Sequence, residues 1–324
     1  MKNKKFDGTP LIEVSHLKKY FNVPAGVNHA VDDVSFTIHK GETVGVVGES
    51  GCGKSTLGRT IIRLLEATDG QVLLEGKDIT HVSGKALKEV REQVQIVFQD
   101  PYSSLNARMD ISSAIKEPLK RSGRFKGKRQ LGEKTQELME LVGIDERLRN
   151  AYPHELDGGR RQRVGIARAL ALQPKFIVCD EPVSALDVSI QAQVLNLLMD
   201  LQDQMGMAYM FVTHDLSVVR HISDNICVMY LGQLVEKCST HELFTNNLHP
   251  YTKALLSAIP TTDVHRPMQR IQLKGEITSP INPKPGCRFA SRCPYATEAC
   301  SQPQKLQEVS QNHFVSCCRV AEIN

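Results

Sequence analysis

The sequence predicts an α/β protein with a mainly parallel sheet covered by helices. Short β-branched runs, which are typical of buried strands, occupy residues 42–47, 95–98, 176–179 and 209–213. Between them, apolar residues recur at spacings of three and four, as in amphipathic helices, over residues 55–65, 161–172 and 188–204. This alternation favours parallel strands joined by helical crossovers.

Size and composition limit the classes of protein to which the chain can belong. Its 324 residues exceed what one compact core usually needs, so we expect one large domain with an appendage, or two domains. With 41% hydrophobic and 23% charged residues, the chain is not a disordered one. No run approaches the ~18 to 20 apolar residues of a membrane-spanning helix, and the first residues lead into no apolar signal segment. A formal net charge of +4 is too balanced to indicate nucleic acid, so we expect no nucleic-acid partner.

The composition changes near Pro260. Seven of the 15 prolines and five of the nine cysteines follow residue 259, where periodic apolar patterns fade. Residues 102–160 carry little strand signal and several helical stretches. We therefore predict a domain of residues 1–259, with a helical subdomain at about 102–160, and a small Cys/Pro-rich extension of residues 260–324.

Residues 48–56 read GESGCGKST and form a candidate phosphate loop. They match G-x-x-x-x-G-K-[ST] between a predicted strand and a predicted helix. The glycines let successive backbone N–H groups point inward as an anion nest at the positive end of a helix. Lys54 adds positive charge for the β- and γ-phosphates of a nucleotide, and Ser55 offers a hydroxyl to Mg²⁺. The candidate ligands of the nucleotide are Gly48, Ser50, Gly51, Cys52, Gly53, Lys54, Ser55 and Thr56.

Cys52 of the phosphate loop has two interpretations. It lies at a predicted helix N-terminus, a setting that lowers the pKa of a thiol, so it is a candidate reactive group. The alternative is a small residue that fits the loop.

Two carboxylates follow the apolar run 176–179. Asp180 is suited to hold Mg²⁺ through water, and Glu181 is suited to orient and deprotonate an attacking water. The alternative is an acidic turn that caps a strand. Beside Lys54 and Ser55, the pair instead indicates a nucleotide-hydrolysing site.

Three further motifs carry a family resemblance. Gln99 lies in VFQDP, Asp187 ends SALD, and His214 lies in THD. With the two motifs above, the chain resembles the ATPase subunit of an ATP-binding cassette (ABC) transporter. The resemblance implies a P-loop NTPase core with an inserted helical subdomain and an N-terminal antiparallel β-subdomain, with ATP and Mg²⁺ as ligands. It also implies that Gln99 senses the metal and the attacking water, that Asp187 acts across a dimer interface, and that His214 contacts the γ-phosphate.

The resemblance further implies an aromatic side chain that stacks on adenine. Tyr20 and its neighbour Phe21 both match this position, and we favour Tyr20.

The signature loop departs from the pattern of the family. The family usually reads L-S-G-G-Q, whereas this chain has Leu156, Asp157, Gly158, Gly159 and Arg160. In the family this loop closes over the γ-phosphate held by the other subunit. Asp is as good a helix N-cap as Ser, but a carboxylate aimed at a phosphate repels it by ~4 kcal/mol for unit charges 4 Å apart at an effective dielectric constant of about 20. Arg160 lies one turn along and could pair with Asp157.

These substitutions support a hypothesis of functional asymmetry in a heterodimer. This chain's own Walker residues, which are its phosphate loop and the two carboxylates, would hydrolyse ATP against a partner with an ordinary signature. The site built on Asp157 would be weaker or would mainly hold nucleotide. The alternative is that Asp157 and Arg160 form an equivalent cap without functional consequence.

Residues 249–256, HPYTKALL, resemble the element that begins the C-terminal extension of oligopeptide and dipeptide permease ATPases, here of the F-type. That resemblance implies import of di- or oligopeptides at the cytoplasmic face of the cell membrane. It also implies a second ATPase subunit as heterodimer partner, two transmembrane permease subunits and an extracytoplasmic solute-binding protein. Import of nickel, glutathione or a metallophore, or a mainly nucleotide-holding regulatory subunit, are the alternatives. A chromosome-maintenance or translation ATPase is disfavoured, because residues 53–157 lack coiled-coil heptads and the chain has one Walker pair.

Four cysteines of the extension form a candidate metal centre: Cys287, Cys293, Cys300 and Cys317, with Cys318 adjacent to the last. Structural zinc sites favour cysteine pairs two to four residues apart, which these spacings lack, whereas spread thiolates can hold a [4Fe-4S] cluster. Relatives in the subfamily resemble the chain in carrying such a set. Zinc, and unligated or oxidised thiols, remain alternatives, and the spacing does not separate Cys317 from Cys318.

Overall fold

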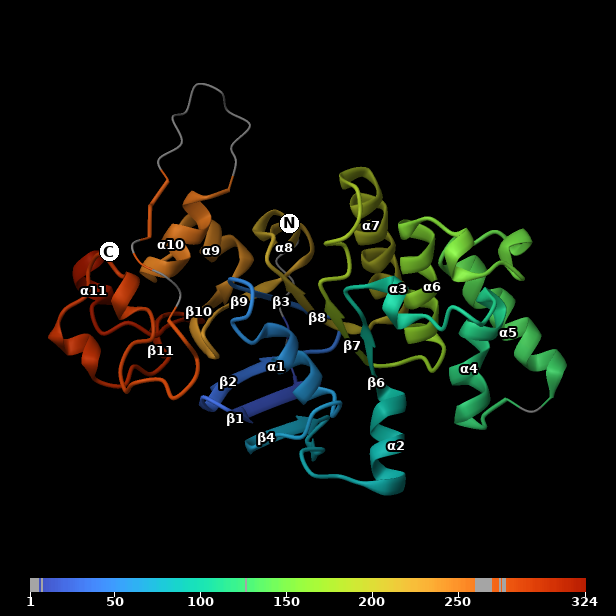
Figure 1. Cartoon of the computed structure of the whole chain (residues 1–324), viewed down its shortest axis with the longest axis horizontal. Helices are drawn as coiled ribbons and strands as arrows, with labels where there is room; N and C mark the ends of the chain where they lie inside the picture. The colour runs from blue at the N-terminus through green and yellow to red at the C-terminus, as the bar shows by residue number, and fades with distance from the viewer. Residues whose placement is uncertain (1–5, 7, 126, 260–269, 274, 276–277) are drawn as a thin grey trace. The chain divides into compact units, whose positions relative to one another are not determined.

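The computed structural model describes residues 6, 8–125, 127–259, 270–273, 275 and 278–324 (Figure 1). They form two compact units. The first unit comprises Met1–Ile38, Thr43–His81 and Phe211–Asn324, and the second comprises His39–Glu42 and Val82–Met210. The predicted domain boundary near Pro260 lies outside the described residues, so that division stays a prediction. None of the described helices combines the length and the apolar character that a bilayer crossing requires.

An antiparallel sheet opens the first unit. Its strand order is β2-β1-β4-β5, and each neighbouring pair is antiparallel. The strands are β1 (Ile12–Val23), β2 (Gly26–Ile38), β4 (Asp69–Leu74) and β5 (Lys77–Asp78). Along β1, Ile12, Val14 and Leu17 are buried, and the register shifts between the last two, where His16 adopts φ 49°. This sheet confirms the N-terminal antiparallel β-subdomain that the family resemblance implied.

The second sheet contains the strands whose ends lead into the candidate site. In the first unit its order is β11-β12-β10-β9-β3-β8, and in the second unit it is β8-β7-β6, because β8 runs through the division between the units. The pairs β3–β9 and β6–β7 are parallel, as expected. The strands are β3 (Thr43–Val47), β6 (Val94–Val97), β7 (Phe176–Asp180), β8 (Ala208–Thr213), β9 (Asn225–Tyr230), β10 (Gln233–Ser239), β11 (Gln307–Ser310) and β12 (His313–Val315).

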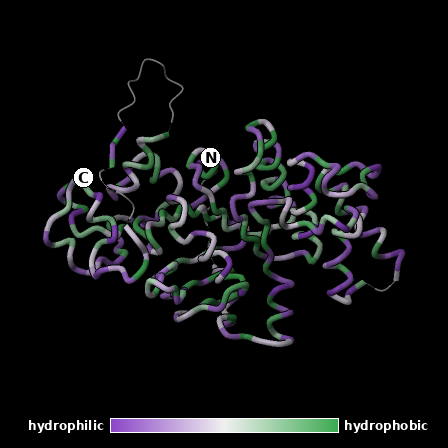
Figure 2. Tube along the Cα trace, in the orientation of Figure 1, coloured by the Kyte–Doolittle hydropathy of each residue, from purple (hydrophilic) through white to green (hydrophobic). Residues whose placement is uncertain are grey.

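Strands β3, β7 and β8 are buried over their whole length, and Figure 2 shows the hydrophobic colouring that this burial requires. A strand that is buried on both faces of a sheet needs apolar side chains on both faces, which explains why these strands read as continuous apolar runs. Four of the predicted strands are therefore confirmed within one residue at either end. The predicted helix 55–65 is shorter in the structure, since it ends at Ile61.

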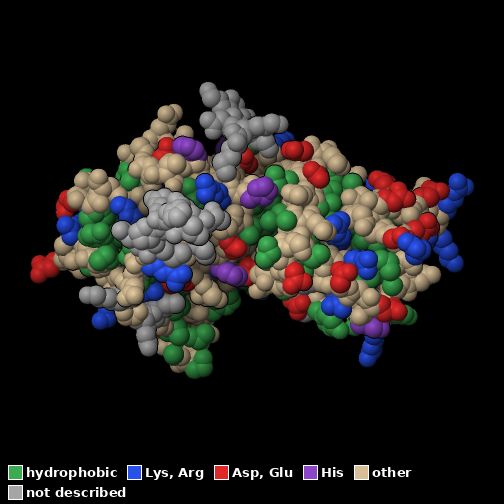
Figure 3. Space-filling view, turned by 90° about the horizontal axis from the view of Figure 1, so that it is seen from above, with side chains coloured by type: hydrophobic (Ala, Val, Ile, Leu, Met, Phe, Trp, Pro, Cys, Tyr) green, Lys and Arg blue, Asp and Glu red, His purple; other side chains and the backbone are tan. Residues whose placement is uncertain are grey.

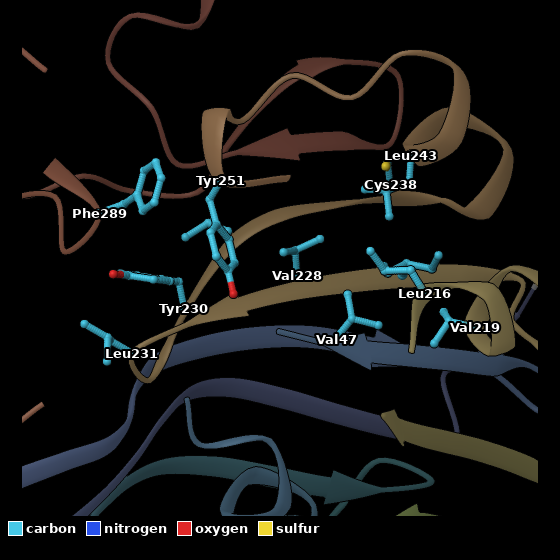
Figure 4. Close-up of a cluster of buried hydrophobic side chains, with 12 residues drawn as sticks. Val47, Leu216, Val219, Val228, Tyr230, Leu231, Cys238, Leu243, Tyr251 and Phe289 are labelled. Atoms are coloured by element: carbon cyan, nitrogen blue, oxygen red, sulfur yellow. The ribbon is translucent and has the colours of Figure 1, made fainter. Parts of the chain in front are cut away.

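Four helices of the first unit flank or follow its strands: α1 (Lys54–Ile61), α8 (Leu216–Ile222), α9 (Thr240–Thr245) and α10 (Pro250–Ser257). Apolar side chains of α8, α9 and α10 and of β3, β9 and β10 form one buried cluster, drawn in Figure 4. Phe289 of the extension belongs to the same cluster. The extension therefore shares its core with the rest of the first unit.

The second unit is mainly helical. Its helices are α2 (Gly84–Gln93), α3 (Pro101–Ser104), α4 (Ile111–Ser122), α5 (Lys128–Leu141), α6 (Gly158–Leu170) and α7 (Val188–Met205), with the 3₁₀ turns η1 (Glu146–Leu148) and η2 (Pro153–Glu155). The described residues between β6 and β7 hold no strand, so the helical character expected of residues 102–160 is confirmed. Acidic and basic side chains lie interspersed at the right-hand end of Figure 3, where Figure 1 places α5.

The extension contributes η3 (Ala290–Arg292), η4 (Glu298–Ser301), α11 (Val320–Ile323) and the hairpin β11–β12, whose second strand pairs with β10. A buried polar contact accompanies this pairing. Nε2 of His313 lies 2.8 Å from Oε1 of Glu236, and both side chains are 0% exposed. Burial alone would raise the pKa of Glu236, but hydrogen bonds from His313 and from the amides of Leu248 and His249 hold that pKa below its usual value.

The first prediction concerns this contact. We expect His313→Ala to lower the free energy of unfolding by about 3 kcal/mol, because it removes a fully buried hydrogen-bond partner of the Glu236 carboxylate. Urea denaturation of the full chain measures the change. The control is Arg129→Ala, which removes the exposed pair of Arg129 and Glu133 and should leave the transition unchanged. Equal effects of the two substitutions would contradict a stabilising role for the buried contact.

Candidate nucleotide site

The phosphate loop joins β3 to α1. Two of its positions require glycine because the backbone of another strand lies too close for a Cβ atom. A Cβ atom at Gly48 would lie 2.1 Å from the carbonyl oxygen of Met229, and one at Gly53 would lie 2.0 Å from that of Ala30. Gly53 also has φ 106°, which side-chain-bearing residues rarely adopt. Any larger residue at either position would displace the loop from β9 or β2.

Lys54, the first residue of α1, is only 4% exposed. Its Nζ donates hydrogen bonds to the carbonyl oxygens of Gly48 (2.8 Å) and Glu49 (2.9 Å). Ser50 and Gly51, at the outer bend of the loop, are exposed. The ammonium therefore lies inside the loop, while the outer amides face solvent.

Cys52 is 3% exposed, and burial raises the pKa of its thiol despite the nearby Lys54 ammonium. Burial and the direction of this pKa shift favour the second interpretation, a small residue that fits the loop.

The two candidate catalytic carboxylates lie at the end of β7 in the second unit. Asp180 is fully buried as the last residue of that strand. Glu181 follows with φ 48°, a left-handed conformation that is uncommon for a non-glycine residue and recurs at functional sites. The side-chain amide of Gln99 donates a hydrogen bond of 3.0 Å to Oε2 of Glu181. The structure thus brings together two predicted site residues that lie 82 positions apart.

The signature loop begins α6 as the sequence predicted. Asp157 is the N-cap and accepts a hydrogen bond of 2.7 Å from the amide of Arg160, whose guanidinium lies 3.4 Å from the other carboxylate oxygen. A Cβ atom at Gly158 would lie 3.0 Å from Leu186, and one at Gly159 would lie 2.6 Å from Ile190. The cap, the pairing with Arg160 and both glycines of the loop therefore have structural explanations.

Two other predicted residues lie at exposed element boundaries. Asp187 is exposed and precedes α7 as its N-cap residue. His214 is exposed in the first unit, directly after β8 and before α8, whose N-cap Asp215 accepts a hydrogen bond from the amide of Ser217.

Tyr20 presents the flat surface expected of an adenine platform. Its ring stacks on that of His29 with centroids 4.0 Å apart and planes 24° apart, and its hydroxyl donates to the carboxylate of Asp32. Burial and the Asp32 charge raise the pKa of Tyr20, so its phenol stays neutral. The Phe21 ring instead faces the ammonium of Lys19, 4.8 Å from its centroid. The choice of Tyr20 over Phe21 stays a prediction.

The sequence reasoning missed Tyr251 as a site residue. Its buried hydroxyl accepts a hydrogen bond of 2.9 Å from the amide of Glu49, so the phosphate loop is held from the side of α10. The signal was present, because Tyr251 is the aromatic residue of the HPYT element.

The four predicted cysteine ligands, Cys287, Cys293, Cys300 and Cys317, line one small cavity of the first unit, which we call the cysteine cavity. Cys318 is exposed and does not line it, although its Sγ lies 4.0 Å from that of Cys300. Burial raises the pKa of the Cys287 thiol to about 11 and also raises that of Cys293 and Cys317. Among the described residues, no three of these sulfur atoms lie within 4.8 Å of one another.

Comparisons with known proteins agree with this geometry. The family described as "ABC transporter" matches residues 31–184, and the one described as "Oligopeptide/dipeptide transporter, C-terminal region" matches residues 235–300. The oligopeptide transport ATP-binding protein AppF of Bacillus subtilis is 51% identical over 95% of this chain and 96% of its own length. OppF of Salmonella typhimurium is 49% identical over 96% of each chain.

The chain belongs to the ABC transporter family. A solved structure of the ATP-binding cassette MJ0796, a dimer bound to ADP and Pi, superimposes with a TM-score of 0.65 and 27% identity, covering 71% of this chain and 98% of that one. The P-loop NTPase fold of an ABC ATPase is therefore confirmed. This ABC ATPase binds ATP and couples its hydrolysis to transport.

Proposed function

We propose that this ABC ATPase energises the import of di- or oligopeptides. It would bind ATP at an interface with a second ATPase subunit and act on two transmembrane permease subunits. An extracytoplasmic solute-binding protein would deliver the peptide to these permease subunits. It would work at the cytoplasmic face of the cell membrane. The near end-to-end similarity to AppF and OppF, named as oligopeptide transport proteins, carries the choice of peptide over nickel, glutathione or a metallophore.

The residues take the following proposed roles. The amides of the phosphate loop and the Lys54 ammonium bind the β- and γ-phosphates, and Tyr20 stacks on adenine. Ser55, Gln99 and Asp180 would hold Mg²⁺, which screens the phosphate charge when bound. Glu181, oriented by Gln99, removes a proton from the attacking water, and His214 contacts the γ-phosphate. Asp187 acts across the subunit interface. Residues 260–324 serve as an extension of the ATPase domain of residues 1–259.

The second prediction separates binding from hydrolysis. We expect Lys54→Ala to abolish ATP binding and turnover, since the loop loses its buried positive charge. We expect Glu181→Gln to bind ATP normally but to lower kcat by about 10² to 10⁴, because the proton acceptor is lost. ATP binding and phosphate release are measured in the assembled complex. Normal turnover by Lys54→Ala would refute the proposed site.

The signature loop supports functional asymmetry between the two ATP sites. The Asp157 carboxylate is partly neutralised by Arg160 but remains half-exposed at the start of α6. In a closed dimer it would face the γ-phosphate that the partner's phosphate loop holds, so the site it completes should hydrolyse ATP slowly.

The third prediction tests this asymmetry. Glu181→Gln in this chain silences the site built on its own Walker residues, so the remaining ATPase activity reports the site completed by Asp157. In that background we expect Asp157→Ser with Arg160→Gln to raise turnover severalfold. Asp157→Asn is the matched variant, since Asn also caps a helix but carries no charge. No gain from either change would favour the equivalent-cap alternative.

We propose that the cysteine cavity holds a [4Fe-4S] cluster. Four thiols line it, and their sulfur atoms are spread more widely than the closed tetrahedral set of a structural zinc ion. Cys287, Cys293, Cys300 and Cys317 would be the ligands, with Cys318 outside the set. The thiols must lose their protons to act as ligands, so binding of the cluster would release protons.

The fourth prediction is spectroscopic. Anaerobically purified chain should absorb near 400 nm and contain about four iron atoms per chain. Cys317→Ser should remove both signals, whereas Cys318→Ser should retain them. Stoichiometric zinc without iron, or the opposite result for the two serine variants, would refute this assignment.

A further inference from the structure

Arg292 of the extension forms a bidentate contact with the phosphate loop. Its Nη1 and Nη2 lie 2.8 and 3.0 Å from the two carboxylate oxygens of Glu49, and its side chain is 9% exposed. Nη1 also lies 3.4 Å from the hydroxyl of Tyr230. Two parallel hydrogen bonds between charged groups fix geometry as well as charge, so the loop residue and the arginine form one enclosed unit.

Arg288, one turn before Arg292, reaches the other end of the candidate nucleotide site. Its guanidinium donates to the carboxylate of Asp32 and to the carbonyl oxygen of Leu231, and its side chain is 6% exposed. The same Asp32 carboxylate accepts the hydroxyl of Tyr20, the proposed adenine platform. Arg288 therefore fixes the carboxylate that fixes Tyr20.

Phe289 lies between the two arginines and anchors their segment. Its ring centroid lies 5.3 Å from that of Tyr230 and 5.4 Å from that of Tyr251. Figure 4 shows these three rings gathered at one end of the buried cluster. Earlier in the extension, the carbonyl of Pro280 accepts from the amide of His29, and Asn282 bonds the backbone of Val27 on β2. The contact of the extension with the rest of the first unit therefore extends well beyond the two arginines.

We propose that Arg288 and Arg292 are positioning residues for nucleotide binding, so that the extension sets the affinity of the ATP site at both of its ends. The inference rests on the proposed ATP site and adds residues outside the proposed set of nucleotide ligands. Arg292 acts on the phosphate end through Glu49, and Arg288 acts on the adenine end through Asp32 and Tyr20.

Because Glu49 is charged, substitutions of Arg292 and of Glu49 should have different effects on nucleotide binding. A carboxylate in a loop that binds phosphates repels them, and Arg292 cancels this charge. Removing Arg292 therefore exposes the repulsion, while neutralising Glu49 removes it. A role of Arg292 confined to folding predicts instead that either change weakens binding.

The fifth prediction measures the affinity of the full chain for a fluorescent ATP analogue. Arg292→Ala should weaken binding about tenfold, Glu49→Gln should leave it equal or tighter, and the double variant should return to within about twofold of the unsubstituted chain. Arg292→Lys should recover part of the loss, because it restores charge without the bidentate geometry. Arg129→Ala, at an exposed position of α5, is the control and should change nothing.

A second ligand separates the two arginines. Inorganic tripolyphosphate carries the phosphates without adenine, so Arg292→Ala should weaken its competition with the analogue while Arg288→Ala leaves it unchanged. Arg288→Ala should weaken binding of ATP itself severalfold. In the assembled complex, Arg288→Ala and Arg292→Ala should raise KM for ATP at nearly constant kcat.

Each contrary result has a defined meaning. Unchanged ATP affinity in Arg292→Ala, or no recovery when Glu49→Gln is added, would overturn the role of Arg292. Equal losses for ATP and tripolyphosphate in Arg288→Ala would overturn the role of Arg288. A chain that binds no analogue, or binds it equally after Lys54→Ala, would overturn the proposed ATP site as well.

Discussion

The buried ammonium of Lys54 is the constraint on which the nucleotide site depends. Taking a charge out of water is costly unless other groups compensate it. Here two carbonyl dipoles of the phosphate loop contribute to the compensation. Carbonyl dipoles hold the ammonium in place without cancelling its charge. The positive field therefore remains available to an anion at the start of α1.

The contacts of the Lys54 ammonium depend on the shape of the phosphate loop, which the rest of the first unit stabilises. The glycines allow the loop to approach β2 and β9. The hydroxyl of Tyr251 accepts a hydrogen bond from the amide of Glu49. The carboxylate of Glu49 is the exception to this logic, since it adds negative charge to an anion site. Its enclosed contact with Arg292 resolves the conflict inside the chain. A favourable site for phosphate thus requires residues that lie 243 positions apart.

This separation explains what the sequence could predict. The phosphate loop, the carboxylates after β7 and the N-cap at Asp157 are local patterns, because their geometry is set by a few successive residues and a strand or helix end. The parallel strands were predicted for the same reason. Contacts across the chain leave no such pattern: Arg288 and Arg292 read as ordinary arginines among cysteines, and His313 gives no sign that it meets Glu236. Cys317 and Cys318 are equivalent in sequence and differ only in which one the fold turns toward the cavity.

The arginines also flank the cysteine cavity, and this has a thermodynamic consequence. Arg288 follows Cys287, Arg292 precedes Cys293, and Phe289 lines the cavity while packing on Tyr251. Since nucleotide affinity and the order of this short segment would share the same contacts, they are linked functions. Linkage is reciprocal, so whatever orders the cysteine cavity favours nucleotide binding by the same free energy with which nucleotide binding orders the cavity. Through these contacts the sulfur-rich extension would have a defined means of acting on the ATP site.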